Sequence, residues 1–155
     1  MSLLKIISVH ENKERFEEFV ASFWKQWGNE SNMMFYKDCM FHSARSAGDL
    51  PSFYIALEDE KIIGTYALLR NDLVSRQDIS PWLACLYVDP SFRGKSIGSQ
   101  LLAHAVQEAS RKGNETLYLT TDHSGYYEKY GWTKMGNCYD LFGNLSSIYQ
   151  KSTSM

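Results

Sequence analysis

A short turn at residues 93–98 has the composition of a phosphate-binding segment. It reads Arg-Gly-Lys-Ser-Ile-Gly and separates an apolar run from a helical pattern. The free N–H groups at the beginning of a helix, together with the positive end of the helix dipole, favour a phosphate group. The small residues let the backbone approach a ligand, and Arg93 and Lys95 add cationic donors. The turn therefore indicates a pyrophosphate site, although an ordinary solvated connection between a strand and a helix can have the same composition.

Two common nucleotide-binding motifs do not fit this turn. A Walker loop needs Gly-x-x-x-x-Gly-Lys-Ser/Thr, and the glycines at 94 and 98 do not have that spacing. The dinucleotide fingerprint needs Gly-x-Gly-x-x-Gly, but the glycine spacing here is wrong and no acidic residue falls in a suitable following strand. These mismatches argue against the usual nucleotide-binding folds.

The elements around the turn follow from the hydrophobic pattern. Residues 82–88 form a nearly continuous apolar run, which is typical of a central strand buried on both faces. Apolar residues from Ile97 onward recur at helical spacing until Gly113 and Asn114, which end the helix. Residues 116–121 are rich in strand-forming residues. A strand, a helix and a strand of these lengths predict a crossover between two parallel strands.

The rest of the chain adds strands and helices to this unit. The apolar residues between positions 16 and 27 recur at helical spacing, and Gly28 stops the pattern. The remaining expected elements are a strand over residues 4–9, helices over 12–27 and 32–45, a hairpin of strands over 53–57 and 62–69, a break at 46–49, a short helix over 125–131, and one or two strands within 132–145. The order β-α-α-β-β-β-α-β-α-β-β predicts an α/β fold with a mixed sheet.

Composition narrows the class of protein and its surroundings. The chain has 155 residues and a formal net charge of −2, which favours neither a nucleic acid nor an anionic membrane as a partner. Its cysteines, Cys39, Cys85 and Cys138, are odd in number and form no metal-ligand cluster, so neither a disulfide framework nor a metal site is expected. The first residues are too few and too polar for a signal peptide or a membrane span. We therefore expect a cytoplasmic protein.

Two motifs together resemble one enzyme family. The strand and turn read Leu86-Tyr87-Val88-Asp89-Pro90 and then Arg93-Gly94-Lys95-Ser96-Ile97-Gly98. This is similar to the Leu-x-Val-x-Pro strand end and the Gln/Arg-x-x-Gly-x-Gly/Ala pyrophosphate motif of the GNAT superfamily of N-acetyltransferases. Farther along, Tyr127-Glu128-Lys129-Tyr130-Gly131-Trp132 looks like that family's Tyr-Glu-Lys-x-Gly-Phe signature. The first half of the chain carries no family motif.

The resemblance implies a fold, a donor and an activity. It implies a single GNAT-like domain over residues 1–155, an α/β fold whose mixed central sheet has helices on both faces. The implied reaction moves an acetyl group from acetyl-CoA directly to a primary amine, with a small molecule as the expected acceptor. The implied cofactor-binding residues are Leu86, Tyr87, Val88, Arg93, Gly94, Lys95, Ser96, Ile97 and Gly98.

Leu86 and Tyr127 receive the central roles in this chemistry. In the family the central strand pairs with the pantetheine arm like an added strand, and the N–H at the Leu86 position stabilises the oxyanion. A bulge in this strand would open that face. Tyr127 matches the family tyrosine that protonates the departing thiolate, a role that a phenol protonated at neutral pH can fill. The alternative is that Tyr127 only packs the short helix.

Two positions depart from the family pattern. Ser96 stands where the motif usually has its first glycine, which matters if the backbone there requires a positive φ. Trp82 stands where some members have a glutamate base. His123, next to Asp122, is the candidate to take the proton of the amine, directly or through water. A chain of waters could serve instead, and Asp122 and His123 could merely cap the short helix.

The acceptor and several alternatives stay open. The residues that could recognise a cation are Asp72, Asp78, Trp24, Trp27, Tyr36 and Trp82. An acetyl-cysteine on Cys85 is disfavoured, since an apolar run keeps the thiol neutral. The competing functions are acetylation of a protein terminus or lysine, and non-catalytic binding of an acyl-CoA. An exposed final strand would support a homodimer.

Overall fold

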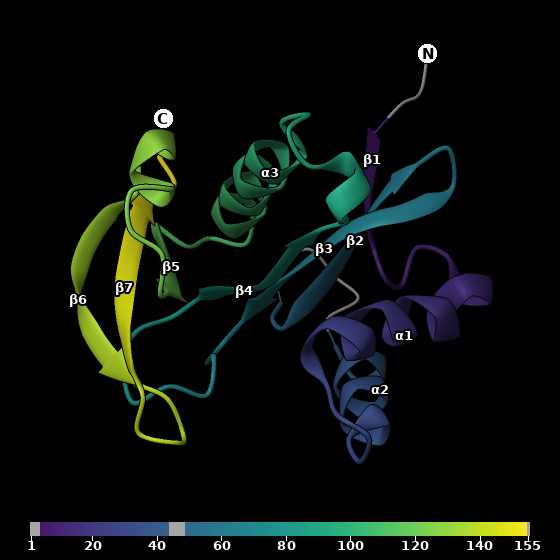
Figure 1. The fold of residues 1–155 in the computed structure, drawn as a ribbon, viewed down its shortest axis with the longest axis horizontal. Coiled ribbons are helices and arrows are strands. Elements are labelled where there is room, and N and C mark those ends of the chain that lie inside the picture. The colour runs from purple at the N-terminus through teal and green to yellow at the C-terminus, as the bar shows by residue number, and fades with distance from the viewer. Residues whose placement is uncertain (1–3, 44–48, 155) are drawn as a thin grey trace.

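The computed structural model describes residues 4–43 and 49–154, which form a seven-stranded sheet with helices on both faces (Figure 1). The strand order is β1-β2-β3-β4-β5-β7-β6. The strands are β1 Leu4–Ser8, β2 Ser52–Glu58, β3 Lys61–Leu69, β4 Trp82–Val88, β5 Thr116–Thr121, β6 Thr133–Tyr139 and β7 Leu145–Ser152. The helices are α1 Phe16–Trp27, α2 Met33–Phe41 and α3 Ile97–Arg111, with single 3-10 turns η1 Lys13–Arg15, η2 Pro90–Phe92 and η3 Tyr127–Tyr130.

The sheet is mixed, as predicted, because one of its neighbouring pairs is parallel. β1 to β4 run antiparallel to one another, and β5, β7 and β6 do the same. The helix α3 connects β4 to β5, which lie parallel, so the predicted crossover is confirmed. That parallel pair is joined at a single register position, Trp82 opposite Tyr118.

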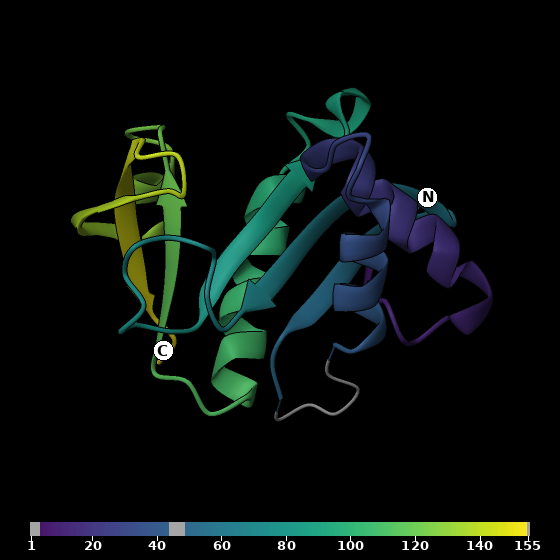
Figure 2. The ribbon, with the colours of Figure 1, turned by 90° about the horizontal axis from the view of Figure 1, so that it is seen from below.

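Side chains alternate between the two faces of the sheet, and each face packs against different helices. On β2, Tyr54 and Ala56 belong to the core beneath α3, whereas Phe53 and Ile55 belong to the core beneath α1 and α2. Figure 2 shows α3 and the α1–α2 pair on the two sides of these strands. A strand buried on both faces reads as a continuous apolar run, which explains why β2 and β4 carry few polar residues.

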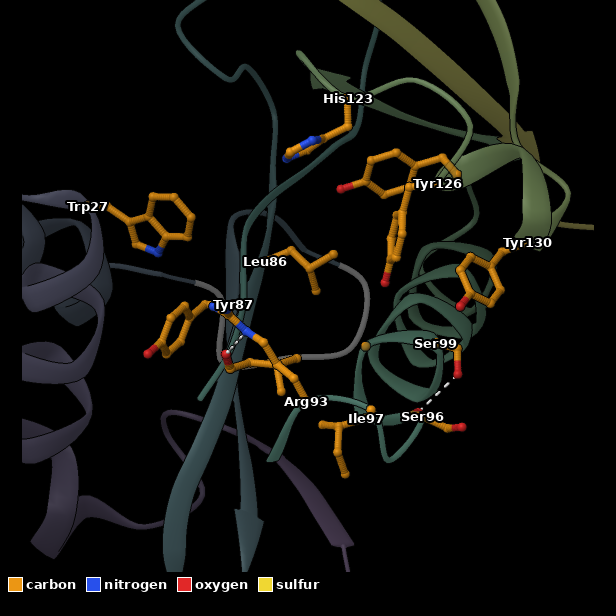
Figure 3. Close-up of a pocket in the computed structure, with 14 residues that line it drawn as sticks. Trp27, Leu86, Tyr87, Arg93, Ser96, Ile97, Ser99, His123, Tyr126 and Tyr130 are labelled. Carbon is orange, nitrogen blue, oxygen red and sulfur yellow. Dashed lines mark hydrogen bonds between the residues drawn. The ribbon is translucent and has the colours of Figure 1, made fainter. Parts of the chain in front are cut away.

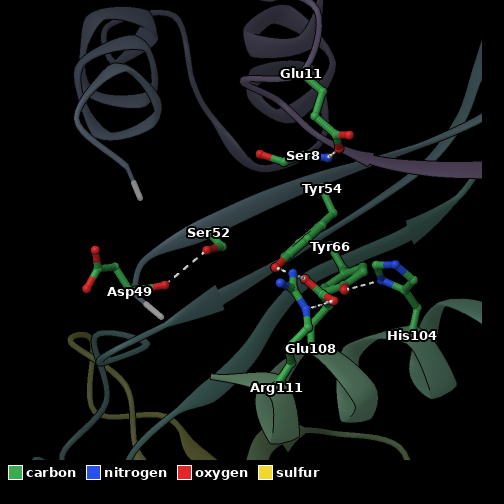
Figure 4. A network of polar contacts seen from close by, with 9 residues as sticks. All are labelled: Ser8, Glu11, Asp49, Ser52, Tyr54, Tyr66, His104, Glu108 and Arg111. Carbon is green, nitrogen blue, oxygen red and sulfur yellow. Dashed lines mark hydrogen bonds and ion pairs between the residues drawn. The ribbon is translucent and has the colours of Figure 1, made fainter. Parts of the chain in front are cut away.

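Polar side chains also fix α3 to the sheet (Figure 4). The Tyr54 hydroxyl donates to Glu108 at 2.8 Å, and Arg111 forms an ion pair with the same carboxylate at 2.6 Å. Tyr66 and His104 form a hydrogen bond of 2.6 Å. Burial raises the pKa of Tyr66 and lowers that of His104, because it penalises their charged forms. No local sequence pattern predicts this partner for His104.

The element order matches the prediction, but several boundaries differ. The first helix opens with the 3-10 turn η1, and regular α-helix begins only at Phe16. The second helix ends at Phe41; residues 44–45 of the predicted helix and residues 46–48 of the predicted break lie outside the described residues. One of the strands predicted within residues 132–145 is present as β6, but the last strand, β7, begins at Leu145 and continues to Ser152, beyond the predicted range. Within 4–43 and 49–154, no helix has the length and apolar character needed to cross a membrane.

Candidate active site

The central strand β4 contains a bulge at Cys85 and Leu86. Thr65 of β3 lies opposite Tyr87, but Ala67 lies opposite Ala84, so β4 has one extra residue between these pairs. Cys85 has a φ of 55°, and its carbonyl accepts a hydrogen bond of 2.8 Å from the Thr65 hydroxyl. A bulge bends its strand and redirects the side chains beside it. β4 therefore has a bulge, which the sequence alone does not show, and the hydrogen bond from the Thr65 hydroxyl stabilises it.

A large cavity lies where β4 and β5 separate beyond their single pair. It has a volume of about 690 Å³, and we call it the turn cavity because the turn at residues 93–98 forms one wall. Figure 3 shows Trp27 of α1 and Tyr126 on opposite sides of Leu86. The lining residues are Trp27, Leu86, Tyr87, Val88, Arg93, Gly94, Ser96, Ile97, Gly98, Ser99, His123, Tyr126, Tyr127 and Tyr130. Every predicted cofactor-binding residue except Lys95 therefore lies at one site; the Lys95 ammonium instead lies 5.3 Å from the Phe92 ring centre.

The backbone of the turn has the conformation that a phosphate cradle requires. Gly94 and Ser96 both have positive φ, 81° and 64°, and Ser96 directly precedes the first residue of α3. The Ser96 side chain makes no capping hydrogen bond. A Cβ on Gly98 would lie 2.9 Å from the Tyr126 hydroxyl, so a side chain there would intrude on the cradle. The residues present thus fit a pyrophosphate, with free helix N–H groups facing it.

Arg93 is held beside β4. Its Nε donates to the Val88 carbonyl at 3.0 Å, and its guanidinium lies 5.9 Å from the centre of the Tyr87 ring. The positive charge is therefore kept at the junction of the strand and the turn, where a phosphate would need it.

Tyr127 lies in a partly buried aromatic cluster. Its ring centre is 5.0 Å from that of Tyr126, 6.2 Å from Trp132 and 6.0 Å from Tyr149. Burial raises the pKa of Tyr127 above its ordinary value, so the phenol stays protonated at neutral pH. The loop before this residue is held by Glu128, which accepts hydrogen bonds of 2.9 Å from the Gly125 N–H and the Tyr149 hydroxyl. Sequence reasoning missed this role of Glu128.

A second cavity, of about 470 Å³, adjoins the first. We call it the Asp72 cavity. It is lined by Trp27, Tyr36, Asp72, Leu83, Ala84, Cys85, Leu86, Leu119, Thr120, Thr121, Asp122, His123 and Tyr127. The residues that line both cavities are Trp27, Leu86, His123 and Tyr127. The predicted oxyanion donor, general acid and proton acceptor thus lie where the two cavities meet.

Half of the suggested cation-recognising set converges in this cavity. Trp27, Tyr36 and Asp72 line it. Asp78 does not, because its carboxylate forms an ion pair with Arg76 at 2.7 Å on the surface of the loop.

The other two tryptophans of that set have structural roles. Trp82 is 0% exposed, its Nε1 donates to the Ile79 carbonyl at 2.9 Å, and its ring lies against Tyr118. The Trp24 indole donates to the Asn29 carbonyl at 2.7 Å. Neither lines either cavity, so the suggestion that they recognise the acceptor was wrong. β4 is apolar on both faces, and its sequence alone does not show which residues face a cavity.

Cys85 and His123 differ in their suitability for chemistry. Burial raises the pKa of the Cys85 thiol to about 12, so at neutral pH it is not the thiolate that a nucleophile requires. His123 is exposed, and its backbone N–H donates to the Thr121 hydroxyl at 3.0 Å. Its position at the shared wall leaves the ring between the cavities and solvent.

Comparison with known proteins agrees with this geometry. The model of the acetyltransferase (GNAT) domain family matches residues 49–134. A curated Agrobacterium fabrum protein, named acetyltransferase Atu2258, is 38% identical over 69 residues, which are 43% of this chain and 47% of that protein. The match therefore spans about half the length of that relative.

Solved structures share the whole fold. An aminoglycoside 6'-N-acetyltransferase complexed with coenzyme A superposes with a TM-score of 0.72 at 15% identity, covering 97% of this chain and 98% of that one. A GNAT-family acetyltransferase from Streptococcus pneumoniae gives 0.69 at 17% identity, covering 98% and 99%. Because the family model matches more than half of the sequence, the chain belongs to the GNAT family of acetyltransferases.

Proposed function

We propose that this chain moves an acetyl group from acetyl-CoA directly to a primary amine of a small molecule. The observation that carries the proposal is the junction of the two cavities at Leu86 and Tyr127. A donor in the turn cavity and an acceptor in the Asp72 cavity would meet there, which is the arrangement that direct transfer between two substrates needs.

The turn and β4 account for donor binding. The pyrophosphate lies on the N–H groups that follow Ser96, and Arg93 contributes its charge. The pantetheine arm runs beside Leu86 and Val88, and its amides pair with the strand edge that β5 leaves open.

The reaction joins the amine nitrogen to the carbonyl carbon and breaks the carbon–sulfur bond. The Leu86 N–H, in the bulged part of β4, donates to the oxygen that becomes negative during attack. Tyr127 gives its phenol proton to the departing sulfur. His123 exchanges the proton released by the amine with solvent, directly or through water. The raised pKa of Cys85 supports direct transfer over an acetyl-cysteine route.

We also propose that the protein works in the cytoplasm and as a homodimer. Its cysteines Cys39, Cys85 and Cys138 are free, which supports a reducing compartment. The final strand β7 lies between β5 and β6, so it is not the exposed strand expected from the sequence; the edge available to a second copy is β6.

Thiol release from acetyl-CoA with a panel of amines, next to direct measurement of CoA binding, tests the proposed reaction. The proposal requires CoA binding and amine-dependent thiol release. CoA binding without release on any small amine would leave a protein acceptor or a non-catalytic acyl-CoA module. No CoA binding at all would refute the donor site.

A further inference from the structure

Asp72 is a partly buried carboxylate with no partner among the described residues. It lies in the loop between β3 and β4 and is half-buried. Its carboxylate makes neither a hydrogen bond nor an ion pair within residues 4–43 and 49–154, in contrast to Asp78 of the same loop. A carboxylate taken out of water without a partner favours its neutral form, and burial raises the pKa of Asp72 to about 7.

The described groups around Asp72 do not neutralise its charge. The titratable side chains that interact with it electrostatically are Tyr36 of α2, Cys85 of β4 and Cys138 of β6. Burial raises the pKa of each of these three, so none supplies a negative or a positive charge at neutral pH. Asp122 and His123 line the same cavity from the end of β5.

The other residues that line the Asp72 cavity favour a ligand with an apolar body. Trp27 and Tyr36 are aromatic, and Leu83, Ala84 and Leu119 are aliphatic. No lysine or arginine is among the described residues, 4–43 and 49–154, that line this cavity. A ligand carboxylate would therefore meet Asp72 and Asp122 without a compensating cation, which is unfavourable. The volume of about 470 Å³ falls in the lower part of the usual range for small-molecule sites, roughly 300–1,000 Å³.

We propose that Asp72 anchors the ammonium of a small primary amine that has an apolar body and no carboxylate, and that Asp72 takes its proton before attack. This inference rests on the proposed acetyl transfer and names the acceptor class and the residue that receives it. Trp27 and Tyr36 hold the body of the amine beside Leu86, and their ring faces add cation–π attraction.

The protons of the reaction balance with this assignment. A primary ammonium carries three protons on nitrogen. Asp72 takes one and releases it to solvent past His123, and one remains on the amide nitrogen. The third leaves the nitrogen after attack and replaces the proton that Tyr127 has given to sulfur. The products are the N-acetylamine, the free CoA thiol and one proton in solution.

The Asp72→Asn variant tests the anchor, and Asp78→Asn is its control. Both remove one negative charge from the same loop, but Asp78 lies outside both cavities. Each protein is assayed for CoA binding, for 2-phenylethylamine binding by the CoA-saturated protein, and for thiol release with 2-phenylethylamine or phenylalanine. The two amines differ only by a carboxylate.

We expect CoA affinity to stay within about twofold of wild type in both variants, which also shows that they fold. Asp72→Asn should weaken 2-phenylethylamine binding at least about tenfold, because a charged hydrogen bond is lost. It should lower kcat/KM about 100-fold or more, whereas Asp78→Asn stays close to wild type. Wild-type kcat/KM should rise with pH through about 7 as Asp72 ionises, and Asp72→Asn should lack this rise. Wild type should prefer 2-phenylethylamine over phenylalanine more than about tenfold.

Each negative result would refute a different part of the proposal. Equal amine binding and turnover by Asp72→Asn and wild type would refute the anchor. A rise near pH 7 that persists in Asp72→Asn would refute the proton transfer to Asp72. Thiol release with other amines, but neither binding nor release with 2-phenylethylamine, would refute the acceptor class and leave acetyl transfer intact. Failure of wild type to bind CoA would instead refute the proposed function.

Discussion

Ser96→Gly should stabilise the protein, although it removes a side chain. Ser96 has a φ of 64°, is exposed, and makes no side-chain capping bond, so the change deletes no capping hydrogen bond. The left-handed conformation costs a residue with a Cβ about 1–2 kcal/mol. Glycine relieves that strain but gives the unfolded chain more freedom, which costs about 0.4–1 kcal/mol. The difference leaves the variant about 0.5–1 kcal/mol more stable, which is a rise in Tm of about 1–4 °C for a domain of this size.

Ser110→Gly provides the matched control. Ser110 is also exposed, but it lies within the helix α3, where glycine is less favourable than serine by about 0.5 kcal/mol. Thermal and urea unfolding of both variants, with and without CoA, should therefore show changes of opposite sign. If Ser96→Gly were destabilised as much as Ser110→Gly, the backbone at the turn would not be strained. A large loss of CoA affinity in Ser96→Gly would show that the serine itself contacts the donor.

Four further substitutions test the site. Tyr127→Phe should lower kcat about 100-fold or more while CoA affinity changes little; an unchanged kcat across the pH range would exclude the general acid. Trp27→Ala should raise the KM for the amine, because Trp27 lines the Asp72 cavity, whereas Trp82→Ala should cost about 3–5 kcal/mol in unfolding free energy without a specific effect on KM. The opposite pattern would reverse these two roles. Cys85→Ala should retain turnover, and detection of an acetylated Cys85 by mass spectrometry during wild-type turnover would contradict direct transfer.

The donor side of the site was predictable because its signals are local. The turn at residues 93–98 lies between a strand and a helix, and the strand end and helix start are both encoded within a few residues. The motif containing Tyr127 follows the next strand, so the parallel pair β4–β5 brings both motifs to one edge of the sheet. The fold was predictable for the same reason, since each element has its own periodicity.

The acceptor side depends on contacts between distant segments. The loop that carries Asp72 is held by β6: the Ser75 N–H donates to the Tyr139 carbonyl at 2.9 Å, and Val74 pairs with Asp140. No local pattern encodes such pairing. The bulge in β4 also has no signal in the sequence, because its positive-φ residue is Cys85 rather than a glycine. The burial of Trp82 depends on contacts with Tyr118 and the Ile79 carbonyl, which become visible only once the sheet is assembled.

The single pairing of Trp82 with Tyr118 means that two strand edges face each other inside the sheet. A strand edge can accept a further peptide-like chain, and proteins ordinarily keep such edges short or covered. Here α3, one register position and the contacts of the β3–β4 loop with Tyr139 and Asp140 link the group β1–β4 to the group β5–β7–β6. A ligand whose amides pair between these groups completes the sheet and couples their unfolding. Ligand binding should therefore stabilise both groups of strands against unfolding, and amide hydrogen exchange should slow in both groups together.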